Sequence, residues 1–212
     1  MIEPNSELII DFELIRNNIQ EIKKKLPKHC NFMGVIKSDA YGHDLKIVTN
    51  AIKDVVDGFG IVRLDEALII RENSSKPILA MQGVYSSDAY EFLKQNNIWT
   101  VIHSTSQLPL AKQFNNSLTF WIKLNTGMNR LGINLNELDE FKSFFKDSNV
   151  LMTHLACSDN PNDELNKIQL DNFHNSWNQA SKKMKRSVLN SNGVINFPEH
   201  SYDWVRVGIA MY

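Results

Sequence analysis

The sequence is poor in the features that mark several classes of protein. It has two cysteines, Cys30 and Cys157, which stand far apart and outside any CxxC spacing. This argues against a disulfide framework or a cysteine-based zinc site. Nine glycines and six prolines are too few for a collagen-like or disordered chain. We therefore expect a globular protein of a reducing compartment, without a bound metal.

The chain also lacks an excess of either charge and any long apolar run. Its 23 basic residues oppose 24 acidic ones, whereas nucleic acids and anionic membranes usually require a basic excess. No apolar segment reaches the length that spans a bilayer, and the first residues do not resemble a signal peptide. We expect a cytoplasmic protein whose partner is a small molecule, and neither nucleic acid nor a membrane.

Short apolar segments alternate with amphipathic ones along the chain. Near-continuous apolar runs are typical of strands buried on both faces of a parallel sheet. They occupy residues 33–36, 58–62, 77–81, 99–102, 119–124, 150–153, 187–189 and 203–206. Helical patterns lie between them, over residues 65–72, 138–145 (following Asn136) and 166–184. Before the first of these strands, Ile15, Ile19, Ile22 and Leu26 share one helix face, with Asp11 as the N-cap.

Eight strand and helix units predict an α/β fold, a (β/α)8 TIM-like barrel with functional groups at the carboxyl ends of its strands. A doubly wound open sheet is the alternative, because periodicity alone does not show closure. Residues 12–212 are expected to form the barrel, ending near the start of the eighth helix. Residues 1–11 are expected to form a separate N-terminal segment, in which Leu8-Ile9-Ile10 is a ninth apolar run. It is expected to be a strand with its partner elsewhere.

The first barrel strand leads into Lys37-Ser38-Asp39-Ala40-Tyr41-Gly42-His43. A lysine at the mouth of a barrel is partly desolvated, which lowers its pKa and allows its amine to form a Schiff base. Taken alone, such a lysine is more often a surface residue whose amine reaches water.

Three further blocks follow later strands. Loops after strands seven and eight commonly bind phosphate in this fold, which makes Ser191, Gly208 and Ile209 reasonable phosphate ligands. The blocks are Lys123-Leu124-Asn125-Thr126-Gly127-Met128-Asn129-Arg130-Leu131-Gly132, Thr153-His154-Leu155-Ala156, and the pair Asn190-Ser191-Asn192-Gly193 and Arg206-Val207-Gly208-Ile209.

In this order, the blocks resemble those of alanine racemases, enzymes of fold type III that use pyridoxal 5'-phosphate (PLP). The Lys37 block is similar to Lys-Ala-Asn-Ala-Tyr-Gly-His, and the Lys123 block to Lys-x-Asp-Thr-Gly-Met-x-Arg-Leu-Gly. The resemblance runs from about Leu8 to Tyr212. It implies PLP as cofactor, the interconversion of L-alanine and D-alanine, D-alanine supply for cell-wall peptidoglycan, and a cytoplasmic homodimer.

The resemblance also implies roles for individual residues. Lys37 would hold PLP as the Schiff-base lysine and act as acid and base on one face of the substrate. Arg130 would be catalytic and would bind the substrate together with Met128. Lys123 would be a candidate for carbamylation. The alternative role for Lys123 is that of an ordinary barrel lysine paired with a carboxylate. The cofactor-binding residues would be Lys37, Tyr41, His154, Asn190, Ser191, Arg206, Gly208 and Ile209.

Two of these cofactor contacts concern the ring. By resemblance, Arg206 would face the pyridine nitrogen and keep it unprotonated, because an arginine does not readily give up a proton. His154 would lie at the ring and bond to that arginine. His103, at the end of the fourth strand, is more consistent with a structural role.

Alanine racemases continue into a mostly β domain, to which the strand at Leu8-Ile9-Ile10 would belong. That domain supplies a tyrosine as the base on the opposite face of the substrate. The 212-residue chain alone is therefore expected to have little or no racemase activity. Asn125 and Val207 depart from the acid and the proline usual in the family. A non-catalytic single-barrel PLP-binding protein and a remnant that binds nothing are the alternatives.

Overall fold

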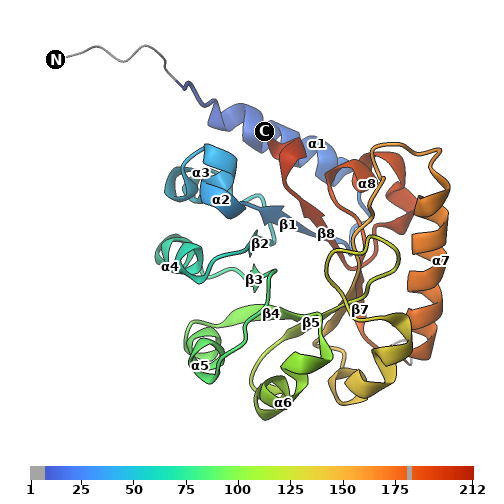
Figure 1. Ribbon diagram of the computed structural model, residues 1–212. Helices are drawn as coiled ribbons and strands as arrows, with labels where there is room; N and C mark the ends of the chain where they lie inside the picture. Colours follow the sequence, from blue (N-terminus) through green and yellow to red (C-terminus); the bar gives the residue numbers. More distant parts are fainter. Residues whose placement is uncertain (1–7, 181–182) are drawn as a thin grey trace.

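In the computed structural model, which describes residues 8–180 and 183–212, eight parallel strands form the centre of the molecule (Figure 1). Their hydrogen-bonded order is β7-β6-β5-β4-β3-β2-β1-β8, so the last strand lies beside the first. The strands are β1 (Asn31–Val35), β2 (Gly58–Ile61), β3 (Ile78–Ala80), β4 (Ile98–Ile102), β5 (Phe120–Lys123), β6 (Val150–Met152), β7 (Lys185–Ser187) and β8 (Trp204–Val207).

The gap between β7 and β8 is bridged by separate hydrogen bonds. The Asp203 N–H donates to the Arg186 carbonyl (3.2 Å) and the Arg206 N–H to the Leu189 carbonyl (3.0 Å). The Ser187 hydroxyl donates to the Trp204 carbonyl (2.8 Å). The nearly closed ring confirms the (β/α)8 barrel and excludes the doubly wound open sheet.

Helices surround the ring on its outer side (Figure 1). None of the helices over the described ranges is long and apolar enough to cross a membrane. The α-helices are α1 (Phe12–Lys24), α2 (Lys37–Gly42), α3 (Leu45–Ile52), α4 (Leu64–Asn73), α5 (Ser87–Gln95), α6 (Leu108–Ala111), α7 (Glu164–Gln179) and α8 (Ser191–Asn196). The 3-10 helices are η1 (Thr105–Gln107), η2 (Lys112–Phe114), η3 (Leu135–Phe144), η4 (Pro198–His200) and η5 (Ile209–Met211).

Helix α1 forms as its sequence predicts. The Asp11 carboxylate accepts hydrogen bonds from the N–H groups of Glu13 (3.0 Å) and Leu14 (3.1 Å), which would otherwise lack partners at a helix start. Ile15, Ile19 and Ile22 are buried on one face. That face covers the barrel.

Several element boundaries differ from the expectation. The segment expected to follow Asn136 is the 3-10 helix η3, which follows Asn134, because the Asn134 N–H donates to the Glu137 carboxylate (2.7 Å). Helix α7 begins earlier, after Asp163, and ends at Gln179, while residues 181–182 of the expected helix lie outside the described residues. Strand β7 begins two residues before the expected start at Ser187.

The expected strand at Leu8-Ile9-Ile10 is not formed in the structure. Leu8 and Ile9 are 67% and 82% exposed, and no strand among the described residues pairs with them. Residues 1–7 of the expected N-terminal segment lie outside the described residues. At the other end, the 3-10 helix η5 follows β8 where the eighth helix is expected to start.

The inside of the barrel is filled by large apolar side chains, most of which come from the first and middle residues of the strands. Trp99 meets Trp204 edge to face, with ring centroids 5.6 Å apart, and Trp121 is fully buried. The cluster consists of Met33, Leu79, Val101, Trp121, Val150, Met152 and Trp204. Because this cluster closes one end, a ligand site is left at the carboxyl ends of the strands.

Candidate active site

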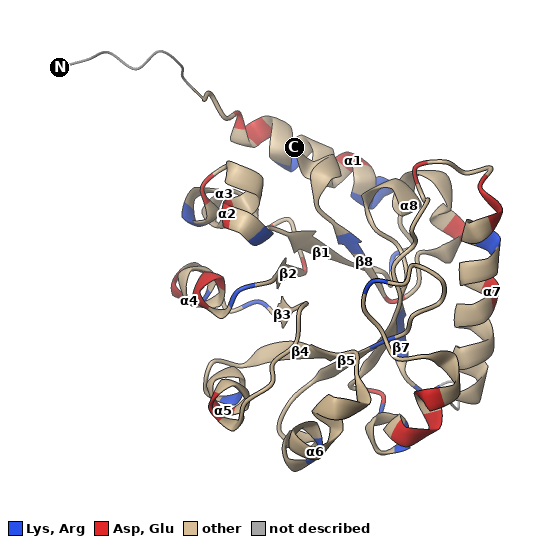
Figure 2. Ribbon diagram, in the orientation of Figure 1, with Lys and Arg blue, Asp and Glu red and all other residues tan. Residues whose placement is uncertain are grey.

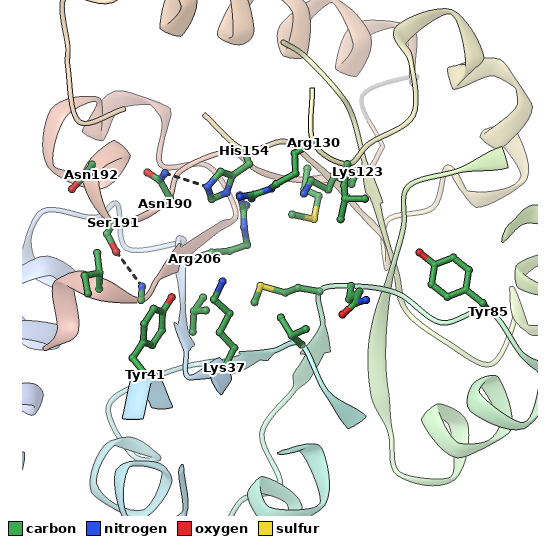
Figure 3. Close-up of a pocket in the computed structure, with 18 residues that line it drawn as sticks. Lys37, Tyr41, Tyr85, Lys123, Arg130, His154, Asn190, Ser191, Asn192 and Arg206 are labelled. Carbon is green, nitrogen blue, oxygen red and sulfur yellow. Dashed lines mark hydrogen bonds between the residues drawn. The ribbon is translucent and has the colours of Figure 1, made fainter. Parts of the chain in front are cut away.

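A cavity of about 470 Å³ opens at the carboxyl ends of the strands (Figure 3). It brings together side chains from β1, β5, β6 and β8, and from the segments that follow the strands, which are far apart in the sequence. The expected site residues that line it are Lys37, Tyr41, Lys123, Arg130, His154, Asn190, Ser191, Arg206, Gly208 and Ile209. Met128 does not line the cavity, although its loop carries Arg130. The assignment of Met128 to the substrate site therefore lacks geometric support.

The cavity is strongly positive. Lys37, Lys123, Arg130 and Arg206 line it, and none of its lining residues is Asp or Glu. Most acidic residues lie on the outer helices and their loops (Figure 2). In the described ranges, no group of three or more His, Cys, Asp or Glu side chains is placed to hold a metal ion. The charge of the cavity favours anionic ligands.

Lys37 and Tyr41 are brought to the cavity by an unusual turn. Lys37 is expected directly after the first strand, but β1 ends at Val35 and Lys37 begins α2. Residues 38–41 have φ between 52° and 57°, the left-handed helical region. Within this turn the Lys37 amine lies 5.9 Å from the centre of the Tyr41 ring, and Figure 3 shows both side chains pointing into the cavity.

Tyr41 faces a wall made by the segments after β7 and β8. There the Ser191 hydroxyl oxygen accepts hydrogen bonds from the N–H groups of Gly208 (3.1 Å) and Ala210 (3.3 Å). Because its oxygen is the acceptor, the hydroxyl hydrogen of Ser191 stays available to a ligand. Burial raises the pKa of Tyr41, so this phenol also remains a donor at neutral pH.

Arg206 is a rigid, fully enclosed cation. Its side chain is 4% exposed, and it donates to the Thr153 carbonyl (2.6 Å), the Val188 carbonyl (3.2 Å) and the Ser187 hydroxyl. Burial lowers the pKa of Arg206 to about 10, which leaves it charged at neutral pH. The carbonyl groups that directly follow β6 and β7 therefore fix a positive charge in the cavity wall.

Lys123 and His154 are the two bases whose protonation the site changes most. Burial lowers the pKa of Lys123 to about 8, and the nearby charges of Arg206, Arg130 and Lys37 add to this effect. Burial, followed by the charge of Arg206 and its neighbours, lowers the pKa of His154 to about 3. His154 is therefore a neutral imidazole, and Lys123 is partly neutral under mildly alkaline conditions.

His154 does not form the expected hydrogen bond with Arg206. Its Nε2 lies instead 3.5 Å from the amide nitrogen of Asn190. The Asn190 carbonyl oxygen accepts from the Ser158 hydroxyl (2.8 Å) and the Gly193 N–H (2.9 Å). The Arg206 guanidinium donates instead to the Thr153 and Val188 carbonyls and the Ser187 hydroxyl. The side chain that orients the imidazole is therefore Asn190.

Two features of the site have no signal in the sequence. Gln169 of α7 is fully buried and donates to the Thr126 hydroxyl (3.2 Å) and the His154 carbonyl (3.0 Å). It thereby ties together the loops after β5 and β6. Tyr85, 57% exposed at the cavity mouth, lies 2.8 Å from Nε2 of His103. The Nε2 of His103 also lies 3.0 Å from the Gln82 carbonyl oxygen.

Comparisons with known proteins agree with the geometry. Residues 10–212 match the family described as alanine racemase, N-terminal domain. The alanine racemase of Mannheimia succiniciproducens is 36% identical over 206 residues, which cover 93% of this chain and 57% of that protein. The enzyme of Pasteurella multocida is 35% identical over 207 residues, with the same coverage. The chain thus spans little more than half the length of these relatives.

Solved structures show the same architecture. The alanine racemase of Acinetobacter baumannii superposes with a TM-score of 0.87 at 29% identity, covering 96% of this chain and 62% of that one. The alanine racemase of Bartonella henselae, solved with covalently bound pyridoxal phosphate, has a TM-score of 0.86 at 25% identity, with the same coverage.

Proposed function

Because the chain belongs to the alanine racemase N-terminal domain family, we propose that it is the barrel of a PLP-dependent enzyme that interconverts L-alanine and D-alanine. The observation that carries the proposal is the position of the Lys37 amine in the same cavity as Tyr41, Ser191 and Gly208. A cavity with four cations and no acidic side chain suits two anions, the PLP phosphate and the alanine carboxylate.

The residues present fit PLP. Tyr41 and Ser191 offer hydroxyl donors for its phosphate, and Gly208 leaves the space between them free because a Cβ there would meet the Tyr41 hydroxyl. Asn190, Ile209 and His154 complete the proposed binding site. Arg206, held by carbonyl groups, would face the pyridine nitrogen and keep its own proton.

When bound, PLP supplies an electron sink that makes the Cα hydrogen of alanine acidic. The residues of this chain would do the rest. Lys37 would carry the cofactor and move a proton to and from Cα on one face of the substrate. Arg130 would bind the carboxylate through its two-pronged guanidinium group. Arg206 would restrain the electron sink, which favours proton exchange at Cα over other reactions.

Lys123 supports a proposal of its own. It is 7% exposed, and among the described side chains it forms no salt bridge, which disfavours its alternative role as a lysine paired with a carboxylate. Its lowered pKa makes a neutral amine available. That amine would add to CO2 and release a proton, and the resulting carbamate would give Arg130 an anionic neighbour in a cavity that has none.

The 212-residue polypeptide alone is proposed to racemise alanine slowly. Racemisation requires a proton donor and acceptor on each face of Cα. Of the lining tyrosines, Tyr41 lies against Gly208 and Tyr85 is bonded to His103, so neither is placed as a second base opposite Lys37. A rate with purified chain equal to that of a full-length alanine racemase would contradict this part of the proposal.

The assembly and the cellular role are further parts of the proposal. Ile209 and Leu131 line the cavity mouth and are 61% and 39% exposed, an apolar rim consistent with coverage by a second subunit in a homodimer. The activity would supply D-alanine for peptidoglycan in the cytoplasm. Sedimentation velocity of the PLP-loaded protein tests the assembly, and a monomer at every concentration would count against it.

The central experiment is the addition of PLP to the purified chain, followed by borohydride reduction. We expect a visible absorbance band that reduction removes, and a mass increase on the peptide that contains Lys37. Lys37→Ala should show neither change, whereas Lys94→Ala, on the outer helix α5, should behave as the unsubstituted protein. Labelling at other lysines but not at Lys37 would refute the proposal.

A second measurement separates the racemase from a non-catalytic PLP-binding barrel. With L-alanine in D2O, Lys37 should exchange the Cα hydrogen for deuterium even where racemisation is slow, because exchange requires a proton carrier on one face only. A binding protein without catalysis would give PLP attachment and no exchange. That result would favour the non-catalytic alternative.

A further inference from the structure

A buried carboxylate lies directly behind the turn that carries Lys37. Glu66 of α4 is 6% exposed. One of its oxygens accepts hydrogen bonds from the N–H groups of Ser38 (2.6 Å) and Asp39 (3.4 Å). The other accepts from the N–H groups of Val62 (3.2 Å) and Arg63 (3.1 Å). The side chain thus joins the segment after β1 to the segment after β2 through four backbone donors.

The turn is the part of the site that most needs such support. Four successive residues other than glycine, at positions 38–41, adopt the left-handed region, where the Cβ of an L-amino acid is crowded by the backbone. In this conformation the Ser38 and Asp39 N–H groups donate to Glu66. Within the turn, the Asp39 carboxylate accepts from the Leu45 N–H (2.7 Å). The carboxylates of Glu66 and Asp39 thus both contribute to holding the turn.

We propose that Glu66 is a positioning residue for the cofactor site, which holds the left-handed turn so that Lys37 and Tyr41 face the same cavity. This inference rests on the proposed PLP site. Glu66 does not line the cavity, so it acts through the Ser38 and Asp39 backbone rather than by touching a ligand. Without it, the turn would relax toward ordinary backbone conformations and carry the Lys37 amine away from Tyr41.

The direct test is Glu66→Gln, which keeps the shape of the side chain and replaces one acceptor oxygen with a donor that faces backbone N–H groups. If the competent turn falls to a tenth of the population, the apparent Kd for PLP rises about tenfold. We expect a rise of that order or more in a PLP absorbance titration. Asp65→Asn is the matched control, because Asp65 lies in the same helical turn and contacts Arg63 instead.

A rescue experiment separates positioning from a general loss of stability. Ser38→Gly should restore much of the PLP affinity lost in Glu66→Gln, because glycine adopts positive φ readily. Ser38 is exposed, and no hydrogen bond of its side chain is lost with the change. A merely structural role for Glu66 at α4 would leave the double variant as weak in PLP binding as Glu66→Gln. That result would overturn the inference.

Amide hydrogen exchange of the protein without PLP gives a readout independent of the cofactor. In the unsubstituted protein the Ser38 and Asp39 amides should exchange slowly, and in Glu66→Gln their exchange should accelerate more than that of core amides in β1. If Glu66→Gln does not fold, amide exchange is measured in the unsubstituted protein alone. Fast exchange of the Ser38 and Asp39 amides in that protein would overturn the inference. If PLP fails to attach to Lys37, the proposed function fails while this measurement still decides the role of Glu66.

Discussion

The hydroxyl of Tyr41 lies against the Cα of Gly208, from the opposite end of the chain. A Cβ on Gly208 would overlap with that hydroxyl and would stand 3.0 Å from the ring carbon that bears it. The φ of Gly208 is negative, −120°, and a side chain at this position would meet the Tyr41 ring. The proposed phosphate-binding site therefore depends on the close packing of Tyr41 against Gly208.

Gly208→Ala should push the Tyr41 ring out of its position. Overpacking of this kind costs about 1–3 kcal/mol, and 1.4 kcal/mol corresponds to a tenfold change in affinity. We expect the Kd for PLP to rise about tenfold, measured by absorbance titration. Tyr41→Phe removes the closest atom, so Gly208→Ala should weaken binding less in a Tyr41→Phe background. Equal effects in both backgrounds would contradict the contact.

Arg206→Lys should lower the free energy of unfolding of the protein even when no ligand is bound. A lysine cannot reach the Ser187 hydroxyl and the Thr153 and Val188 carbonyls together, and charged hydrogen bonds contribute about 1.5–3 kcal/mol each. We expect the free energy of unfolding in urea to fall by about 2 kcal/mol or more. Arg63→Lys, at an exposed arginine paired with Asp65, should change it by less than about 0.5 kcal/mol. A similar loss in both variants would argue against the rigid Arg206.

His154 should contribute to loss of stability in acid. Its pKa in the folded protein, about 3, lies below the ordinary value of 6.5, so between these values the unfolded chain binds a proton that the folded protein does not. Stability therefore falls as the pH drops from about 6.5 to 3, with a slope of up to roughly 1.4 kcal/mol per pH unit from this group. Urea unfolding at several pH values measures it.

The acid effect should be smaller in His154→Gln, because glutamine does not take up the proton. His29→Gln, at an exposed position, is the control and should retain the pH dependence of the unsubstituted protein. An unchanged profile for His154→Gln would show that the imidazole is not held neutral by its surroundings.

Lys123 should carry a carbamate when bicarbonate is present. In ¹³C-bicarbonate buffer, the NMR spectrum should contain a protein-bound carbonyl signal that disappears on acidification, because carbamates lose CO2 in acid. Lys123→Arg should abolish the signal, since a guanidinium stays protonated in proteins and is not a nucleophile. Lys94→Ala should leave it intact. A signal that persists in Lys123→Arg would assign the modification to another lysine.

The sequence predicted the architecture well because its signals are local. Strand burial and helix amphipathicity gave the (β/α)8 barrel, and Asp11 marked the first N-cap correctly. The boundaries around η3 and β7 were less accurate. The start of η3 is set by the local capping box of Asn134 and Glu137, which the apolar pattern alone did not locate. The strand expected at Leu8-Ile9-Ile10 has no partner among the described residues.

The motif blocks also predicted most of the residues that line the cavity. Met128 was an exception, since a position in a loop motif does not determine which side chains of the loop point inward. Gln169 and Tyr85 were not predicted because their partners lie in distant segments. Glu66 accepts locally from Val62 and Arg63, but its contact with the turn after β1 joins residues 27 and 28 positions apart, and no spacing in the sequence indicates that contact.

The sequence by itself determined the order of strands and helices and the charged residues at the strand ends, because apolar periodicity and residue type are properties of short segments. The tertiary structure decided the left-handed turn after β1, the contact of Tyr41 with Gly208 and the neutral state of His154. Each of these depends on burial and on groups brought together from distant parts of the chain, which a linear pattern does not encode.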